Sequence, residues 1–191
     1  WISSSFKFRY FTIMNFTEPD HIQMLRDTLK KFIKNEMPKS LVSKWDQEDY
    51  FPKDVFKKLV DLGVTSLTVP EEYGGSGVDM VATIATIEEL SSRSIGIASG
   101  FIQCACYAGL NILESGSTEQ KNELLPRVAN GELLFSYGIS EPDVGGDVAS
   151  VSTIARLEND EVIINGSKRW CSGALIADYI FTLVRSGPAD E

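Results

Sequence analysis

One segment of the chain combines a hydroxyl, an acid and paired glycines in a pattern that could hold a ligand. It reads YGISEPDVGGD over residues 137–147 and carries Ser140, Gly145 and Gly146. Because glycine lets a backbone approach a ligand closely, consecutive N–H groups here could point at an anion such as a pyrophosphate. The Ser140 hydroxyl could donate to a carbonyl or ring nitrogen of a flat cofactor. An ordinary glycine-rich turn, with Asp147 as a cap, fits the same residues equally well.

A second segment reads NGSKRWCSG over residues 165–173 and places Trp170 two positions before Ser172. If this segment is a strand, the two side chains lie on one face of a sheet, because side chains alternate along a strand. An aromatic plane and a hydroxyl would then face the same ligand. Simple core packing of Trp170 is the alternative.

Other residues that could do chemistry indicate no site. His21 is the only histidine, which excludes a Ser-His-Asp or Cys-His nucleophile and a multi-histidine metal site. The glycines of EEYGGSG, at residues 71–77, have neither dinucleotide nor P-loop spacing and no surrounding βαβ unit. Cys104 and Cys106 lie in an apolar segment and are interpreted as packing residues.

The composition is typical of a soluble globular protein. The 191 residues are 43% apolar and 24% charged. A net charge of −9 without a basic cluster argues against nucleic-acid binding. Three cysteines form neither a disulfide framework nor a zinc pattern, which favours reduced thiols in an intracellular protein. Residues 94–113 contain Gly, Ser, Gln, Cys and Asn, so we interpret this weakly charged run as a buried core helix and predict no membrane segment.

Helical signals dominate the first two thirds of the chain. A first amphipathic helix is predicted from about residue 17 to Pro38, and a second from Pro52 to Gly63. Residues 64–77 lose the helical period and are interpreted as a loop.

Three further helices follow this loop. Asp79 starts the first of them, with a predicted apolar face made of Met80, Ile84, Ile87 and Leu90. Residues 95–114 form the next, and a capping box of Ser117 and Gln120 opens the last.

After Gly131 the pattern changes to short β-branched and aromatic segments. Antiparallel strands are predicted from about residue 132, with Asn159-Asp160 as one turn, over the segments LLFSYGIS, VSTIARL, EVIIN and DYIFTLVR. The predicted organisation is an upstream or non-native arm at 1–13, a helical domain at 14–131 and an incomplete β domain at 132–191; a targeting presequence and a genuine arm are alternatives for 1–13. About four strands with one apolar face would form a half-sheet whose apolar face is poorly covered. We therefore expect further sequence beyond Glu191.

Three motifs together, VPEEYGG, YGISEPDVGGD and NGSKRWCSG, resemble the acyl-CoA dehydrogenase family from about Met14 to the end of the chain. The resemblance implies an α+β multidomain fold, in which a helical domain is followed by an antiparallel β-barrel-like middle domain, truncated here, and then by a four-helix domain. It also implies FAD-dependent α,β-dehydrogenation of an acyl-CoA thioester, with hydride passing to flavin N5. The carboxylate base of the family is expected beyond Glu191, so we name no catalytic residue and expect this chain alone to be inactive.

Carried over by position, the family motifs imply specific roles. The Ser140 hydroxyl and N–H would lie near flavin N1 and O2, and Ser172 would reach toward N5. The residues implied to bind FAD are Tyr137, Ile139, Ser140, Gly145, Gly146, Trp170, Cys171 and Ser172. Those implied to contact the acyl-CoA are Ser99, Gly100, Gln103, Tyr107 and Gly146.

Two departures from the family pattern are visible. Many relatives read Gly-x-Gly-Ser-Asp where this chain reads Asp143-Val144-Gly145-Gly146-Asp147, so a serine hydroxyl is absent at Gly146 and only backbone contacts are expected there. Cys171 and Ser172 stand where Ile-Thr is frequent, which keeps the hydroxyl but changes the fit against the ring.

The resemblance also implies partners and a compartment. The expected electron acceptor is an electron-transfer flavoprotein, and the expected assembly is a homodimer or homotetramer. The expected location is the cytoplasm, or the mitochondrial matrix in a eukaryote. An acyl-CoA oxidase or a flavin monooxygenase of the same fold is the nearest alternative. A non-catalytic interaction module is the more distant one.

Overall fold

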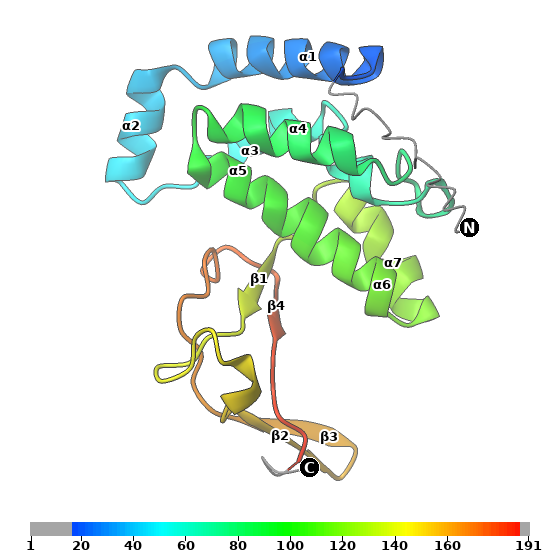
Figure 1. Ribbon diagram of the computed structural model, residues 1–191, viewed down its shortest axis with the longest axis vertical. Helices are drawn as coiled ribbons and strands as arrows, with labels where there is room; N and C mark the ends of the chain where they lie inside the picture. Colours follow the sequence, from blue (N-terminus) through cyan, green and yellow to red (C-terminus); the bar gives the residue numbers. More distant parts are fainter. Residues whose placement is uncertain (1–16, 188–191) are drawn as a thin grey trace, which may run out of the picture.

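The computed structural model describes residues 17–187, as a helical part followed by a β region (Figure 1). The predicted arm at 1–13 lies outside the described residues. The α-helices are α1 (Asp20–Glu36), α2 (Lys39–Gln47), α3 (Lys53–Val60), α4 (Met80–Ser91), α5 (Ile95–Phe101), α6 (Asn111–Ser115) and α7 (Thr118–Ala129). The order of the two parts confirms the predicted fold class.

Local signals set several helix ends as predicted. Asp79 caps α4, with its carboxylate accepting from the Ala82 N–H at 2.8 Å. Ser117 and Gln120 form the predicted capping box of α7. Gly63 adopts φ 78° after α3, a left-handed conformation that glycine reaches without a steric penalty.

Two helical features were not predicted. The helix α2 lies in a segment for which no element was expected, and residues 64–77 contain two short 3₁₀ helices, Val64–Thr68 and Glu71–Tyr73. Both 3₁₀ helices begin directly after a glycine or a proline, and they turn the chain without a sustained apolar period.

The predicted apolar face of α4 is wrong in part. Met80 and Ile84 are 43% and 51% exposed, whereas Ala82 and Ala85 are buried against α1. Small side chains let the two helix backbones approach closely, so packing selects the alanine face.

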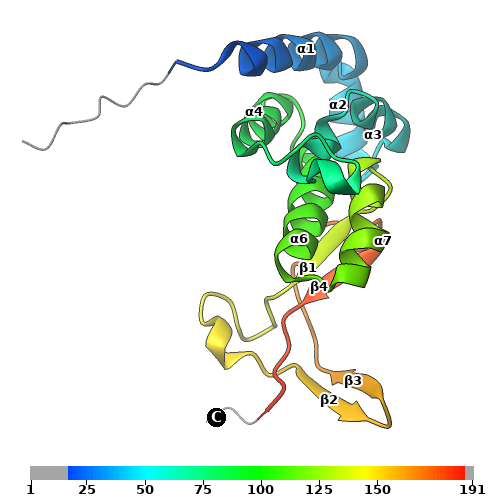
Figure 2. The ribbon, with the colours of Figure 1, turned by 90° about the vertical axis from the view of Figure 1, so that its right-hand side faces the viewer.

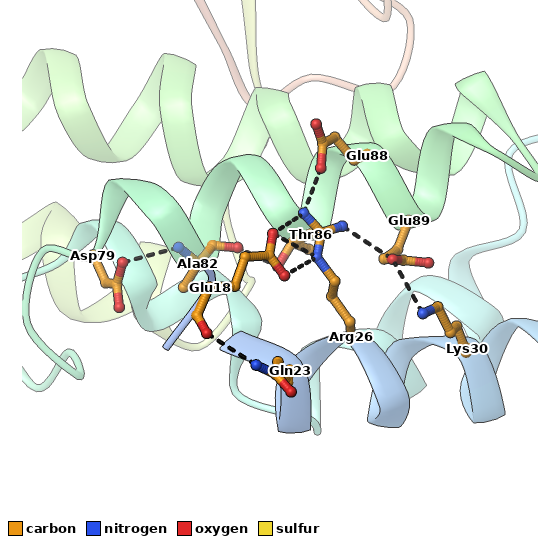
Figure 3. A network of polar contacts seen from close by, with 9 residues as sticks. All are labelled: Glu18, Gln23, Arg26, Lys30, Asp79, Ala82, Thr86, Glu88 and Glu89. Atoms are coloured by element: carbon orange, nitrogen blue, oxygen red, sulfur yellow. Dashed lines mark hydrogen bonds and ion pairs between the residues drawn. The ribbon is translucent and has the colours of Figure 1, made fainter. Parts of the chain in front are cut away.

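A polar network also joins α1 to α4 (Figure 3). Arg26 on α1 donates to Glu18 at 2.6 Å, to Glu88 at 2.6 Å and to Glu89 at 3.0 Å. These carboxylates, Glu18 first, raise the pKa of Arg26 above its usual range. The Arg26 side chain is only 19% exposed, so it ties α4 to α1 and to Glu18 just before it at a partly buried position.

The predicted core helix at 95–114 is present, but its middle is π-helical. The segment η3 (Ile102–Leu110) continues α5 into α6, and the three run as one continuous rod in Figure 1. Side chains satisfy two of its carbonyls, since Thr68 Oγ1 donates to Ala105 O at 2.8 Å and Asn111 Nδ2 to Tyr107 O at 2.7 Å. By length and composition the rod could cross a membrane, yet 56% of its most apolar window is buried by the rest of the protein.

The strands form two small sheets. The hairpin β2 (Ile154–Glu158) and β3 (Glu161–Asn165) is antiparallel as predicted, and its turn residues Asn159 and Asp160 have φ 49° and 65°. The strands β1 (Phe135–Gly138) and β4 (Tyr179–Thr182) instead pair in parallel, so the antiparallel prediction is wrong for them. A long crossover separates them in sequence, which lets β4 return in the direction of β1. Figure 2 shows this pair next to the helices and the hairpin farther away.

Candidate functional site

The two segments singled out in the sequence lie side by side. The Arg169 N–H donates to Ser140 O at 2.8 Å, and Lys168 Nζ donates to Ile139 O at 3.0 Å. The Ser136 hydroxyl, on β1 just before the Ser140 segment, donates to Ser172 O at 2.9 Å. Tertiary folding therefore brings the predicted flavin-facing Ser140 and Ser172 into neighbouring backbone segments.

Trp170 does not lie on a strand, which corrects that prediction. Its φ is 63°, and residues 166–178 carry no strand assignment. Its side chain is 74% exposed, so the alternative of simple core packing is also wrong. The Arg169 guanidinium lies 4.4 Å from the ring centroid, over one face. An aromatic plane held at the surface in a left-handed backbone conformation is the kind of strained feature that clusters at ligand sites.

The glycine loop after Ser140 is open. A Cβ added to Gly145 or to Gly146 would meet no atom within 4 Å, and neither glycine has a left-handed φ. Neither space nor backbone conformation in the described protein therefore requires glycine at these positions. The two glycines leave room for a ligand against consecutive backbone N–H groups.

Glu141 anchors both ends of this loop. Its carboxylate, with the side chain 2% exposed, accepts from Ser152 N at 2.7 Å, Ser152 Oγ at 2.6 Å and Thr153 N at 2.9 Å. Lys168 Nζ lies 2.9 Å from the same carboxylate. These hydrogen bonds, that of Ser152 first, hold the pKa of the Glu141 carboxyl well below its usual range.

The rod contributes Gln103 and Tyr107 to the junction with the β region. Gln103 is 3% exposed and lies against Gly173, and its Oε1 has no hydrogen-bond partner within residues 17–187. The Tyr107 ring stacks on Tyr137, with centroids 3.9 Å apart and planes 10° apart. Because Tyr107 covers this face of the Tyr137 ring, that face is not available to a ligand.

Three further residues predicted to line the site are Ser99, Gly100 and Cys171. Ser99 accepts from Gln103 Nε2 at 3.1 Å, whereas Gly100 lies beneath Phe51, whose Cζ would stand 2.6 Å from an added Cβ. Cys171 lines a small cavity of about 330 Å³ together with Phe51 and Gly173. The space beside Gly100 is therefore already filled by Phe51.

A second cavity lies away from the paired segments. It measures about 650 Å³, opens between α2 and the turn from α4 to α5, and is lined by residues that include Trp45, Tyr50 and Arg93. None of the predicted site residues lines it. It is open to solvent and lined by both polar and apolar residues, so it indicates no particular ligand.

The comparisons with known proteins settle the family. Residues 19–132 match the model of the acyl-CoA dehydrogenase N-terminal domain, and residues 136–191 match that of the middle domain. The chain belongs to the acyl-CoA dehydrogenase family. The resemblance inferred from three motifs is thereby confirmed.

Individual relatives of the chain agree with this family. A glutaryl-CoA dehydrogenase of Desulfococcus multivorans is 32% identical, with 87% of this chain matching 43% of the relative. An acyl-CoA dehydrogenase of Bacillus anthracis in complex with FAD is 29% identical with a TM-score of 0.77, and the match covers 88% of this chain and 30% of that one. A chain in a structure of the electron-transferring flavoprotein of Acidaminococcus fermentans is 29% identical with a TM-score of 0.79, covering 87% and 44%. The chain thus spans less than half the length of these relatives.

Sequence reasoning missed four residues that hold this site together. The predictions assign no role to Lys168, Ser136, Gly173 or Glu141. The available signal was weak, because each acts through a partner at least eleven positions away in the chain.

Proposed function

We propose that this chain forms the FAD-binding part of an acyl-CoA dehydrogenase that introduces an α,β double bond into an acyl-CoA thioester. The observation that carries the proposal is the pairing of the Ser140 segment with the Trp170–Ser172 segment beside an open glycine loop. The family assignment supports the reaction class. We assign no residue of this chain to removal of the α proton.

The donor set fits FAD. Within residues 17–187 neither the Ser140 nor the Ser172 hydroxyl has a hydrogen-bond partner, so both are available to a ligand. The open cradle at Gly145 and Gly146 suits a pyrophosphate, and the exposed Trp170 ring suits a flat ring system. When bound, FAD supplies the hydride acceptor at N5.

The protein groups have distinct tasks in this arrangement. Donors at Ser140 would hold the N1 and O2 edge of the flavin, where negative charge gathers on reduction, and so favour the reduced form. Ser172 would fix the ring near N5, while the Gly145-Gly146 backbone would hold the pyrophosphate. Tyr137, Ile139 and Cys171 would contribute neighbouring backbone and apolar surface. Gln103, Ser99 and Tyr107 stay predictions for contacts to the acyl group.

The proposal extends to partners. Electrons would pass to an electron-transfer flavoprotein, and similarity to a chain in such a structure supports this. A homodimer or homotetramer and the acyl-CoA substrate follow from the family resemblance.

The test is spectroscopic. The protein that contains this chain should purify with, or be reconstituted by, FAD, and addition of a saturated acyl-CoA without oxygen should bleach the flavin band. A well-folded protein that binds no FAD would instead support a non-catalytic interaction module. Fast reoxidation by air after bleaching would support an acyl-CoA oxidase or a monooxygenase.

A further inference from the structure

Lys168 is a nearly buried cation with two fixed partners. Its side chain is 11% exposed, and its Nζ lies 3.0 Å from Ile139 O and 2.9 Å from Glu141 Oε1. Three donors from Ser152 and Thr153 already hold the Glu141 carboxylate, so it is a rigid counter-ion. The Lys168–Glu141 pair is therefore a fixed dipole whose positive end lies on the Ile139 carbonyl.

The Ile139 carbonyl and the Ser140 N–H belong to the same planar peptide group. A cation that binds the oxygen draws electron density from the nitrogen, which makes the N–H a stronger hydrogen-bond donor. Within residues 17–187 the Ser140 N–H donates to no acceptor. The chain thus holds a polarised and unused donor at the edge of the candidate site.

We propose that Lys168 is a positioning residue that polarises the Ile139–Ser140 peptide and so strengthens the Ser140 N–H as a donor to the N1 and O2 edge of the flavin. The proposal rests on the proposed function and adds a residue that touches neither cofactor nor substrate. Its effect is on the flavin potential, because negative charge at this edge is greater in the reduced form.

The experiment compares charge removal with charge retention. Lys168→Met should lower the midpoint potential of bound FAD and weaken binding of reduced FAD relative to oxidised FAD by about tenfold, the scale of one hydrogen bond to a charged group. Lys168→Arg keeps the charge and should restore most of the potential. Glu141→Gln removes the counter-ion but keeps Lys168, so it should leave the potential unchanged or raise it.

A double variant separates this role from simple neutralisation of a buried carboxylate. K168M/E141Q leaves no unpaired buried charge and should fold, yet its potential should stay low because the cation on Ile139 O is gone. Recovery of the wild-type potential in K168M/E141Q would overturn the proposal. So would a K168M protein with an unchanged potential.

A measurement without FAD keeps the proposal distinct from the proposed function. In the apoprotein, the Ser140 amide nitrogen resonance reports the hydrogen bond at Ile139 O, and it should shift in K168M but return in K168R. The same resonance position in all three proteins would overturn the polarisation. If the resonance shifts in K168M but the wild-type protein binds no FAD, the proposed function alone would be overturned.

Discussion

The side-chain amide of Gln103 occupies the space that a Cβ atom on Gly173 would need, with Nε2 and Oε1 each 2.3 Å from that position. Gly173 also has φ 74°, a conformation that other residues adopt at a cost. This contact joins the π-helical segment to the loop that carries Trp170 and Ser172. It makes the placement of that loop depend on the helical part.

Gly173→Ala should destabilise the protein and displace the loop. The added methyl clashes with Gln103 and strains the backbone, at a cost of about 1–3 kcal/mol, measured by denaturant unfolding. Combining it with Gln103→Ala should recover part of the loss, since the clash is relieved. Strictly additive effects of the two substitutions would contradict direct contact.

Gly145→Ala and Gly146→Ala should separate ligand binding from folding. Both methyls enter open space, so stability should change by less than about 0.5 kcal/mol. We expect FAD affinity, measured by fluorescence titration, to fall because the methyls narrow the proposed pyrophosphate cradle.

Gly131→Ala is the matched control for these substitutions. Its methyl would lie 2.3 Å from Val60 Cγ2, so the free energy of unfolding should fall, and because Gly131 is not among the proposed FAD-binding residues the FAD affinity should not change. Unchanged FAD affinity in both loop variants would argue against the cradle.

Stability should fall in acid partly through Glu141. Its pKa is lowered in the folded protein, so its contribution is complete above the unfolded value of about 4.3 and is lost as the pH falls toward the folded value. Urea unfolding between about pH 6 and pH 3 should show a steeper loss of unfolding free energy for the wild type than for K168M/E141Q, because the double variant has no ionisable carboxyl at position 141. Parallel curves for the two proteins would show that Glu141 is not a source of the acid sensitivity.

The cysteines should differ in reactivity. Burial raises the pKa of Cys104 to about 12 and also raises the pKa of Cys106, whereas Cys171 is half-buried beside the small cavity. A maleimide at pH 8 should label Cys171 first and Cys104 only after unfolding, as read by peptide mass spectrometry. Early labelling of Cys104 would mean that the rod opens locally. We also expect modification of Cys171 to weaken FAD binding, with Cys171→Ser as the unreactive control.

The sequence alone determined the features that depend on near neighbours. Caps at Asp79 and Ser117, the left-handed Gly63 and the Asn159-Asp160 turn were predictable because short-range hydrogen bonds and backbone sterics set them. The family motifs also predict Ser140, Trp170 and Ser172 as site residues, and these roles stay predictions.

Only the tertiary structure decided the features that depend on distant partners. Packing against α1 chose the alanine face of α4, and a long crossover let β4 run parallel to β1. Trp170 left the predicted strand for an exposed turn. The proposed role of Lys168 depends on its contacts with Ile139 and Glu141, which lie more than 25 positions away in the chain. Such contacts arise when the chain closes on itself, because the burial and charge pairing that fix them do not exist in any local segment.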